Sequence, residues 1–232
     1  MSIHKDHRQR LRDRFLKEGL DNFDELYVLE LLLFYCIPRV DTNPLAHRLL
    51  EHFGSLNNVL NASADDLEKV EGIGKNTATF LTLITQVGRY YHVKQAEQVK
   101  LLTTIDQCGH YLVPYFFGRE QETVFMLCLD AKCKVICCKL VGEGSVNSAN
   151  IPIRRVVEIA LAANATSVVL AHNHPSGLAL PSADDIQTTQ RVADALNTVE
   201  ITLADHIVVS NEDFVSIVQS GFYIPKDTCG VQ

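Results

Sequence analysis

The stretch SVVLAHNHPSGLALPSADD, residues 167–185, decides which fold and which chemistry we expect of this chain. Its opening is short, apolar and rich in β-branched residues, which predicts a buried strand over 167–171. Proline and glycine at 175–177 end that strand and turn the chain. A helix is then predicted over 182–196, with Ser182 as its N-cap. The stretch therefore connects the core of a sheet to the start of a helix.

Three side chains of this stretch have the chemistry of metal ligands. Side chains alternate along a strand, so His172 and His174 are expected to point the same way. Asp185 is the third residue of the predicted helix and offers a carboxylate from its first turn. Two imidazoles and one carboxylate leave a fourth tetrahedral position open, which is typical of catalytic zinc rather than structural zinc. Such an ion lowers the pKa of a bound water to about 7 and polarises a carbonyl oxygen.

Two neighbours of Asp185 receive different expectations. Ser182 would stabilise an oxyanion if its hydroxyl faced the metal, although it cannot fully do this and cap the helix at once. Asp184 is about 100° around the helix from Asp185 and should face solvent. We therefore expect Asp185→Ala to remove most metal and activity, and Asp184→Ala to be nearly silent.

The spacing of these residues resembles a known family signature. His172-x-His174, seven residues, Ser182, two residues and Asp185 match the JAMM motif of JAB/MPN metallopeptidases. The strings HNHPSG and PSADD are similar to the RadC branch of that family. The helical front of the chain and Asp205-His206, before a predicted strand at 207–209, extend the resemblance to essentially the whole chain.

The resemblance implies roles for particular residues. His172, His174 and Asp185 would bind Zn²⁺, and Ser182 would stabilise the oxyanion. The family also uses a glutamate from an earlier strand as general base on the water. Its best match is Glu122, just before the strand predicted over 123–129. Two further glutamates, Glu143 and Glu158, remain open because spacing does not show which carboxylate reaches the water.

The function that follows from the resemblance is zinc-dependent hydrolysis of an amide bond, in a protein or peptide substrate, by a metallopeptidase or isopeptidase. The alternative is a DNA-associated accessory protein, in a repair or recombination context, whose zinc domain mainly binds a partner. A two-histidine, one-carboxylate iron site and a nuclease are weaker interpretations, because nothing indicates an oxygen-using cofactor and many nucleases use two metals.

The first part of the chain, 1–98, is predicted to be a helical domain. Its sequence EGIGK, residues 71–75, places two glycines around one aliphatic residue between two amphipathic helices, of which the second is expected over 76–90. This resembles a helix-hairpin-helix motif, in which Gly72, Gly74 and Lys75 would contact a DNA backbone. The alternatives are a compact fold element or a protein-docking surface, because four acidic residues lie on the approach.

The second part, 104–232, is predicted to be a JAB/MPN-like α/β domain around a mixed sheet, separated from the first by a polar linker near 95–104. Strands are expected over 123–129, 135–141, 167–171 and 201–209. Helices are expected over 105–115, 153–164 and 182–196. The fold class is therefore α/β, preceded by a helical N-terminal domain.

Composition limits the remaining possibilities. The chain has 232 residues, of which 47% are hydrophobic and 21% charged, with a net charge of −7. Residues 101–232 hold eight Lys and Arg against fourteen Asp and Glu, so this part is unsuited to broad phosphate binding. No apolar run reaches the length of a membrane helix and no secretory signal is visible, so we expect a cytoplasmic protein and no membrane partner.

Other residues receive mainly structural interpretations. The seven cysteines are odd in number and contain no CxxC pair, so we expect reduced core thiols rather than a zinc site. His206 is expected to be a structural histidine, with support of a metal ligand as the alternative. The arginines at 8, 10, 12 and 14 are expected to form a solvated face with acidic partners at Asp6 and Asp13.

Overall fold

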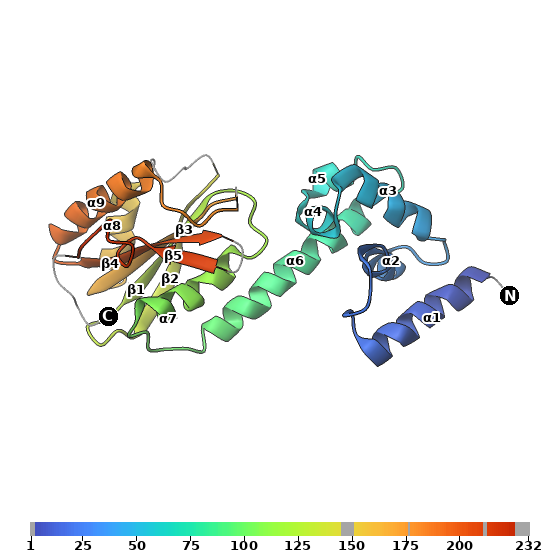
Figure 1. Ribbon diagram of the computed structural model, residues 1–232, viewed down its shortest axis with the longest axis horizontal. Coiled ribbons are helices and arrows are strands. Elements are labelled where there is room, and N and C mark those ends of the chain that lie inside the picture. The colour runs from blue at the N-terminus through green and yellow to red at the C-terminus, as the bar shows by residue number, and fades with distance from the viewer. Residues whose placement is uncertain (1–2, 145–150, 176, 211–212, 226–232) are drawn as a thin grey trace. The chain divides into compact units, whose positions relative to one another are not determined.

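The computed structural model describes residues 3–144, 151–175, 177–210 and 213–225 (Figure 1). The chain divides into two compact units, one ending at Val87 and the other beginning at Gly88, and each is described by itself. The division falls within the helix α6 (Lys75–Ala96), earlier than the predicted linker. Its last turns belong to the second unit because Val93 and Ala96 pack against that unit's core.

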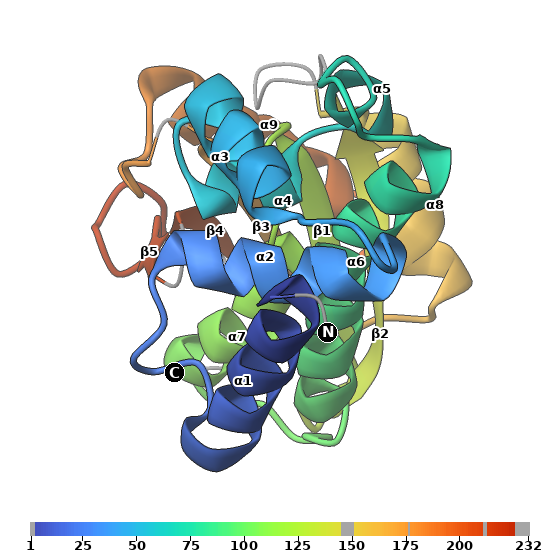
Figure 2. The same cartoon turned by 90° about the vertical axis from the view of Figure 1, so that its right-hand side faces the viewer.

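The first unit is helical, as predicted, and its helices can be followed in Figure 2. Before α6 come α1 (Ile3–Glu18), α2 (Glu25–Cys36), α3 (Asn43–Phe53), α4 (Leu56–Asn61) and α5 (Ala64–Leu67). One apolar cluster joins α2 to α6, and Leu29, Leu33, Leu49 and Leu81 are fully buried in it. Gly54 ends α3 in the left-handed conformation at φ 85°, as expected for a glycine after a helix.

The arginines of α1 form the predicted solvated face only in part, because Arg10 is exposed whereas those at 8, 12 and 14 are half-buried. Arg8 lies over the ring of Phe34, at 4.6 Å from its centroid, and donates to the carbonyl oxygen of Ile37. Arg14 likewise covers the ring of Phe23, at 4.5 Å. Cation–π contacts of this kind arise because a planar guanidinium stacks well on an aromatic face. Two of these arginines therefore attach α1 to its neighbours.

The second unit is the predicted α/β domain. Its strands are β1 (Thr123–Leu129), β2 (Val135–Glu143), β3 (Ser167–Asn173), β4 (Thr202–Ser210) and β5 (Asp213–Ser216), in the spatial order β2-β1-β3-β4-β5. The sheet is mixed, as expected, because β3 and β4 are parallel while the other neighbours are antiparallel. The short edge strand β5 was not predicted.

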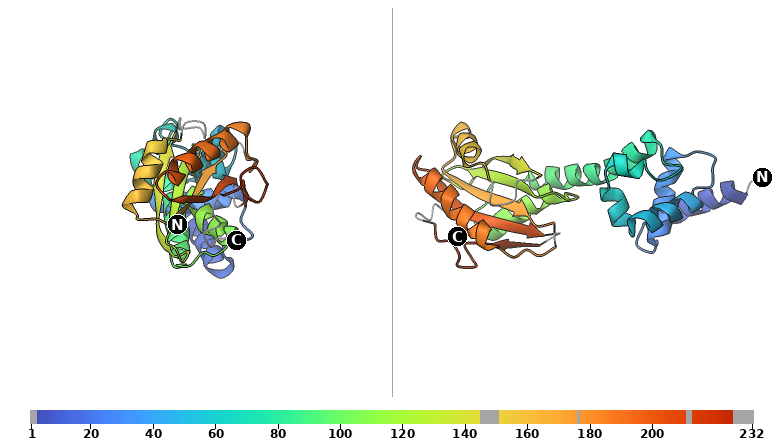
Figure 3. Two further views of the ribbon diagram at one scale, coloured as in Figure 1. Left: turned by 90° about the vertical axis from the view of Figure 1, so that its left-hand side faces the viewer. Right: turned by 90° about the horizontal axis from the view of Figure 1, so that it is seen from above.

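Helices cover both faces of this sheet (Figure 3). On one face, α8 (Ile153–Ala162) and α9 (Ala183–Asn197) pack on a core that includes Met126, Leu170 and Val208. On the other, α7 (Ile105–Leu112) and the short 3-10 helix η1 (Val113–Phe116) pack on Leu127, Val169 and Val209. Neighbouring residues of β3 thus enter different cores, as the alternation of side chains requires.

The strand β3 extends two residues further than predicted. The strand β3 continues through His172 and Asn173, because both pair with Val208 and Val209 of β4. Asp205 and His206 lie within β4, in agreement with the strand expected over 201–209. These residues are therefore held by backbone pairing on rigid elements.

The cysteines of the described residues form no disulfide, in agreement with the sequence. Cys128 and Cys137 face each other across β1 and β2, in the core under α8 and α9, whereas Cys133 and Cys138 belong to the opposite core. This division separates the thiols that a zinc site would need. Over the same residues, no helix combines the length and the apolar character of a membrane span.

Candidate metal centre

The structure brings the three predicted ligands together. The Nε2 atoms of His172 and His174 are 3.0 Å apart, and Asp185 Oδ1 lies 3.0 Å from His172 Nε2. Asp185 Oδ2 lies 3.5 Å from His174 Nε2, and one ligand atom from each residue falls within 4.8 Å of the others. The side chains of His172 and Asp185 are 1% and 0% exposed, and that of His174 is 16% exposed. Two of the three side chains are thus buried, and the third, His174, is accessible to solvent at its edge.

His174 is held at the end of β3. Its backbone nitrogen donates to the carbonyl oxygen of Val209, which extends the pairing with β4 by one residue. Its ring Nδ1 lies 3.1 Å from the carbonyl oxygen of Leu178. Because a carbonyl oxygen only accepts, this contact assigns the proton of a neutral His174 to Nδ1. Its Nε2 lone pair is then directed at His172 and Asp185.

Asp185 is held by the start of α9. Ser182 is the N-cap, as predicted, and its Oγ accepts from the backbone nitrogen of Asp185 at 3.1 Å. The Ser182 nitrogen and hydroxyl both donate to Asp185 Oδ2 at 2.6 Å, which completes a capping box. Asp184 is exposed, as expected from its helical offset. The oxyanion role of Ser182 stays a prediction, and it requires the hydroxyl to turn away from Asp185.

His206 lies directly behind the first predicted ligand, His172, where the alternative interpretation placed it. Its Nε2 is 2.8 Å from His172 Nδ1, and its Nδ1 is 2.6 Å from the hydroxyl of Thr189. Burial lowers the pKa of His206 well below the usual value, and the nearby His172 lowers it further, so the ring is neutral. Thr189 lies one helical turn after Asp185 on α9, and that helical spacing is the sequence signal by which it could have been predicted.

The chemistry of the donor set fits a divalent cation. Two imidazole nitrogens and a carboxylate oxygen converge, and each presents a lone pair to the same small volume. Lone pairs at this spacing repel unless a cation or a proton lies among them. Among the described residues, this is the group of histidine, cysteine and acidic side chains able to hold a metal ion.

The three glutamates considered as general base occupy different places. Val124 pairs with His172, so the alternation of side chains places Glu122, two residues earlier, toward the face of His172. Glu143 pairs with Thr123 and forms an ion pair with Arg119. Glu158 is exposed on α8 and forms an ion pair with Arg154 at 2.7 Å. Register and pairing favour Glu122, although they do not test its role.

Asn173 supports the segment that carries Glu122. Its Oδ1 accepts from the backbone nitrogen of Thr123 at 2.8 Å. Its Nδ2 donates to the carbonyl oxygens of Gln121 and Arg119 at 3.2 and 3.3 Å. The side chain is buried, and these three bonds fix the backbone on both sides of Glu122. No local pattern predicts this role of Asn173, because its partners lie some fifty residues earlier.

The residues predicted to contact DNA lie in the first unit. Gly72 adopts φ 95°, and a Cβ added there would meet Leu45 and Arg48 at 3.3 Å. Gly74 has nothing within 4 Å of an added Cβ, and Lys75 is exposed at the start of α6. Ile73, between the glycines, is buried in the helical core, as predicted. Gly72 therefore has a structural role, and contact of Gly72, Gly74 and Lys75 with DNA stays a prediction.

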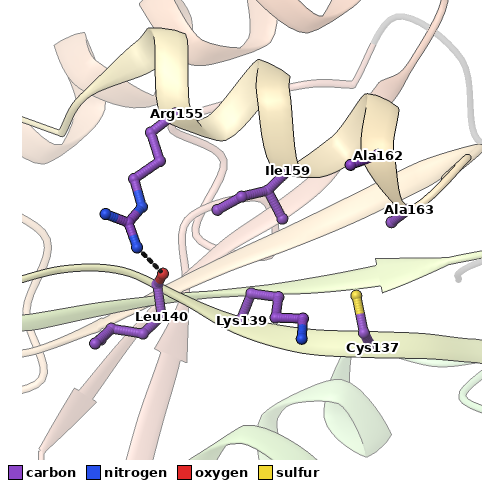
Figure 4. Close-up of a pocket in the computed structure, with 7 residues that line it drawn as sticks. All are labelled: Cys137, Lys139, Leu140, Arg155, Ile159, Ala162 and Ala163. Carbon is purple, nitrogen blue, oxygen red and sulfur yellow. Dashed lines mark hydrogen bonds between the residues drawn. The ribbon is translucent and has the colours of Figure 1, made fainter.

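A separate pocket of about 310 Å³ lies between β2 and α8 (Figure 4). Its side-chain charges are the cations Lys139 and Arg155, and Arg155 donates to the carbonyl oxygen of Leu140 at 3.2 Å. The other lining residues are Cys137, Ile159, Ala162 and Ala163. None of the predicted ligands lines this pocket, so we do not assign it to the metal centre.

The second unit is therefore an α/β domain with a candidate metal site, which consists of two histidines at the end of a strand and one aspartate at the start of a helix. The family described as "RadC-like JAB domain" matches residues 102–222, and this chain belongs to that family. It is 34% identical over 222 residues to UPF0758 protein FN0909 of Fusobacterium nucleatum, covering 93% of this chain and 96% of that protein. It is also 34% identical over 218 residues to UPF0758 protein SPO0054 of Ruegeria pomeroyi, covering 94% and 97%.

Proposed function

We propose that this protein is a zinc-dependent hydrolase that cleaves an amide bond in a protein or peptide substrate. The observation that carries the proposal is the convergence of His172, His174 and Asp185 within 4.8 Å. The exposed edge of His174 leaves that group accessible from one side. Two histidines and one carboxylate are the ligand set of several zinc hydrolases, which keep one position for water or substrate.

Zinc, when bound, supplies Lewis acidity and lowers the pKa of water. Glu122 is assigned as the general base that takes the proton of the attacking water and passes it to the leaving amine. Ser182 is assigned to donate a hydrogen bond to the oxyanion that forms from the substrate carbonyl. The proposal gains support from the fixed backbone around Glu122 and from the position of Ser182 beside Asp185.

Metal removal tests the proposal on the whole protein. We expect the purified chain, after treatment with a chelator, to rebind one Zn²⁺ and to be stabilised by it. At a free zinc concentration one hundred times Kd, the expected gain is about 2.7 kcal/mol in the free energy of unfolding. A peptide library incubated with the zinc-loaded protein should be cleaved, and the metal-free protein should leave it intact. Absence of zinc binding at saturating concentration would refute the proposal.

A second role, docking on a DNA backbone, is proposed for the first unit. Its support is the open space around Gly74 and the exposed Lys75 at the start of α6. We expect Gly74→Ala to fold normally, because the added Cβ meets nothing, yet to weaken DNA binding by blocking close approach of a phosphate. Fluorescence anisotropy with a labelled duplex at two salt concentrations measures this. Equal affinity of wild type and Gly74→Ala would argue against docking here.

A further inference from the structure

Behind the proposed zinc ligands, a chain of three hydrogen bonds runs from α9 across β4 to β3. It links the carbonyl oxygen of Asp185 to Thr189 Oγ1 at 2.6 Å, Thr189 Oγ1 to His206 Nδ1 at 2.6 Å, and His206 Nε2 to His172 Nδ1 at 2.8 Å. Thr189 and His206 are 0% exposed and His172 is 1% exposed. The chain thus begins and ends on two of the three predicted ligands.

The direction of each hydrogen bond in this chain follows from the chemistry of its ends. The Asp185 carbonyl oxygen only accepts, so the single hydroxyl hydrogen of Thr189 is donated to it. The Thr189 oxygen must then accept from His206, which places the His206 hydrogen on Nδ1. A neutral His206 therefore offers a bare Nε2, and His172 donates to it from Nδ1. With either ring reversed, at least one short contact would join two acceptors.

This direction determines which nitrogen of His172 is available. Its Nδ1 carries hydrogen whether the ring is neutral or cationic, so only Nε2 can present a lone pair. That atom lies 3.0 Å from both His174 Nε2 and Asp185 Oδ1. An imidazole with the opposite tautomer would direct an N–H at the metal position and could not bind there.

We propose that Thr189 and His206 are positioning residues that fix His172 in the tautomer able to bind a metal through Nε2. The inference rests on the proposed function, since it assigns His172 as a zinc ligand. It adds two residues to the centre. Thr189 lies on α9, which also carries Asp185, and His206 lies on β4, which carries none of the three proposed ligands. Residues that orient a ligand in this way typically contribute 10- to 100-fold to metal affinity.

Two substitutions of Thr189 separate this role from simple packing. Thr189→Val keeps the shape and removes the hydroxyl, whereas Thr189→Ser keeps the hydroxyl and leaves a methyl-sized space. Packing alone predicts that serine is the more harmful change at a fully buried position. The hydrogen-bond chain predicts the reverse order: zinc affinity about tenfold weaker in Thr189→Val, and within about twofold of wild type in Thr189→Ser.

His206 offers a second matched pair, which covers the case in which a Thr189 variant does not fold. His206→Gln places an amide oxygen near the position of Nε2, where it can accept from His172 Nδ1, whereas His206→Leu provides no acceptor. We expect zinc affinity, measured by competition with a chelator of known Kd, to fall in His206→Leu and to be largely retained in His206→Gln. Equal affinities within both pairs, or a weaker Thr189→Ser than Thr189→Val, would overturn the proposal.

The tautomer itself can be read without metal. In ¹⁵N-labelled, metal-free protein, long-range ¹H–¹⁵N spectra distinguish a histidine protonated at Nδ1 from one protonated at Nε2. The His172 signals, assigned by their absence in His172→Ala, should show Nδ1–H in wild type and Thr189→Ser, and a mixture in Thr189→Val. A mixture in wild type would overturn the positioning role. Failure of wild type to bind zinc would instead refute the proposed function, so the two failures are distinguishable.

Discussion

Asp185→Asn should abolish zinc binding while leaving the fold intact. The substitution removes the negative charge but keeps a carbonyl oxygen for the backbone nitrogen of Ser182, so the start of α9 remains capped. Residues that only support a ligand contribute 10- to 100-fold to metal affinity, so we expect loss of the ligand itself to weaken zinc binding by more than about 100-fold. Isothermal titration calorimetry of the metal-free protein with Zn²⁺ measures the change directly.

Asp184→Asn is the matched control for this prediction. It removes the same charge from the neighbouring residue of the same helical turn, but Asp184 is exposed and Asp185 is 0% exposed. We expect Asp184→Asn to bind zinc with wild-type stoichiometry and to be stabilised by it. Zinc should produce no rise in the melting temperature of Asp185→Asn. Similar zinc binding by the two variants would show that the carboxylate at 185 is not a ligand.

Glu122→Gln should eliminate most hydrolysis and leave zinc affinity unchanged. An amide keeps the size of the carboxylate but cannot take a proton from water, and general acid–base groups typically contribute 10²- to 10⁴-fold to rate. We expect kcat on a peptide that wild type cleaves to fall within that range. Calorimetry on the same variant should return the wild-type Kd for zinc, because Glu122 is assigned as a base and not as a ligand.

Glu143→Gln and Glu158→Gln are the controls for the general base. Glu143 forms an ion pair with Arg119, and Glu158 forms one with Arg154. Each carboxylate is thus already held by an arginine outside the ligand group. Both variants should retain kcat close to that of wild type. A full-activity Glu122→Gln enzyme, or a loss confined to Glu143→Gln, would assign the base elsewhere.

The grouping of His172, His174 and Asp185 could be predicted from the sequence because their geometry is local. His172 lies in β3, His174 directly follows that strand, and Asp185 lies in the first turn of α9, so alternation and helix capping were enough to place them. The contacts of the supporting residues could not be predicted in this way, although His206 was considered as a support of a ligand. His206 reaches His172 only because β4 pairs in parallel with β3, and Asn173 reaches Thr123 only because β1 pairs with β3. Pairing of distant strands is not encoded in local spacing.

The fold shows the same limit. The predicted helices of the first unit and the strands β1, β2, β3 and β4 of the second follow from local sequence patterns, of which periodicity is the strongest. The edge strand β5 has four residues, and α4 has six, so both are too short for a periodic pattern. The predicted helix over 76–90 continues to Ala96 because Val93 and Ala96 pack against the core of the second unit. The residues around them are polar, so no apolar periodicity is visible there in the sequence.

Asn173, the residue between His172 and His174 at the end of β3, links two parts of the site mechanically. Asn173 forms hydrogen bonds with the backbone on both sides of Glu122, while its neighbours His172 and His174 belong to the group that could hold a metal ion. Any sliding or tilting of β3 during thermal motion would therefore carry both sets of atoms along together. The distance between Glu122 and the two histidines is therefore expected to stay nearly constant when the sheet moves.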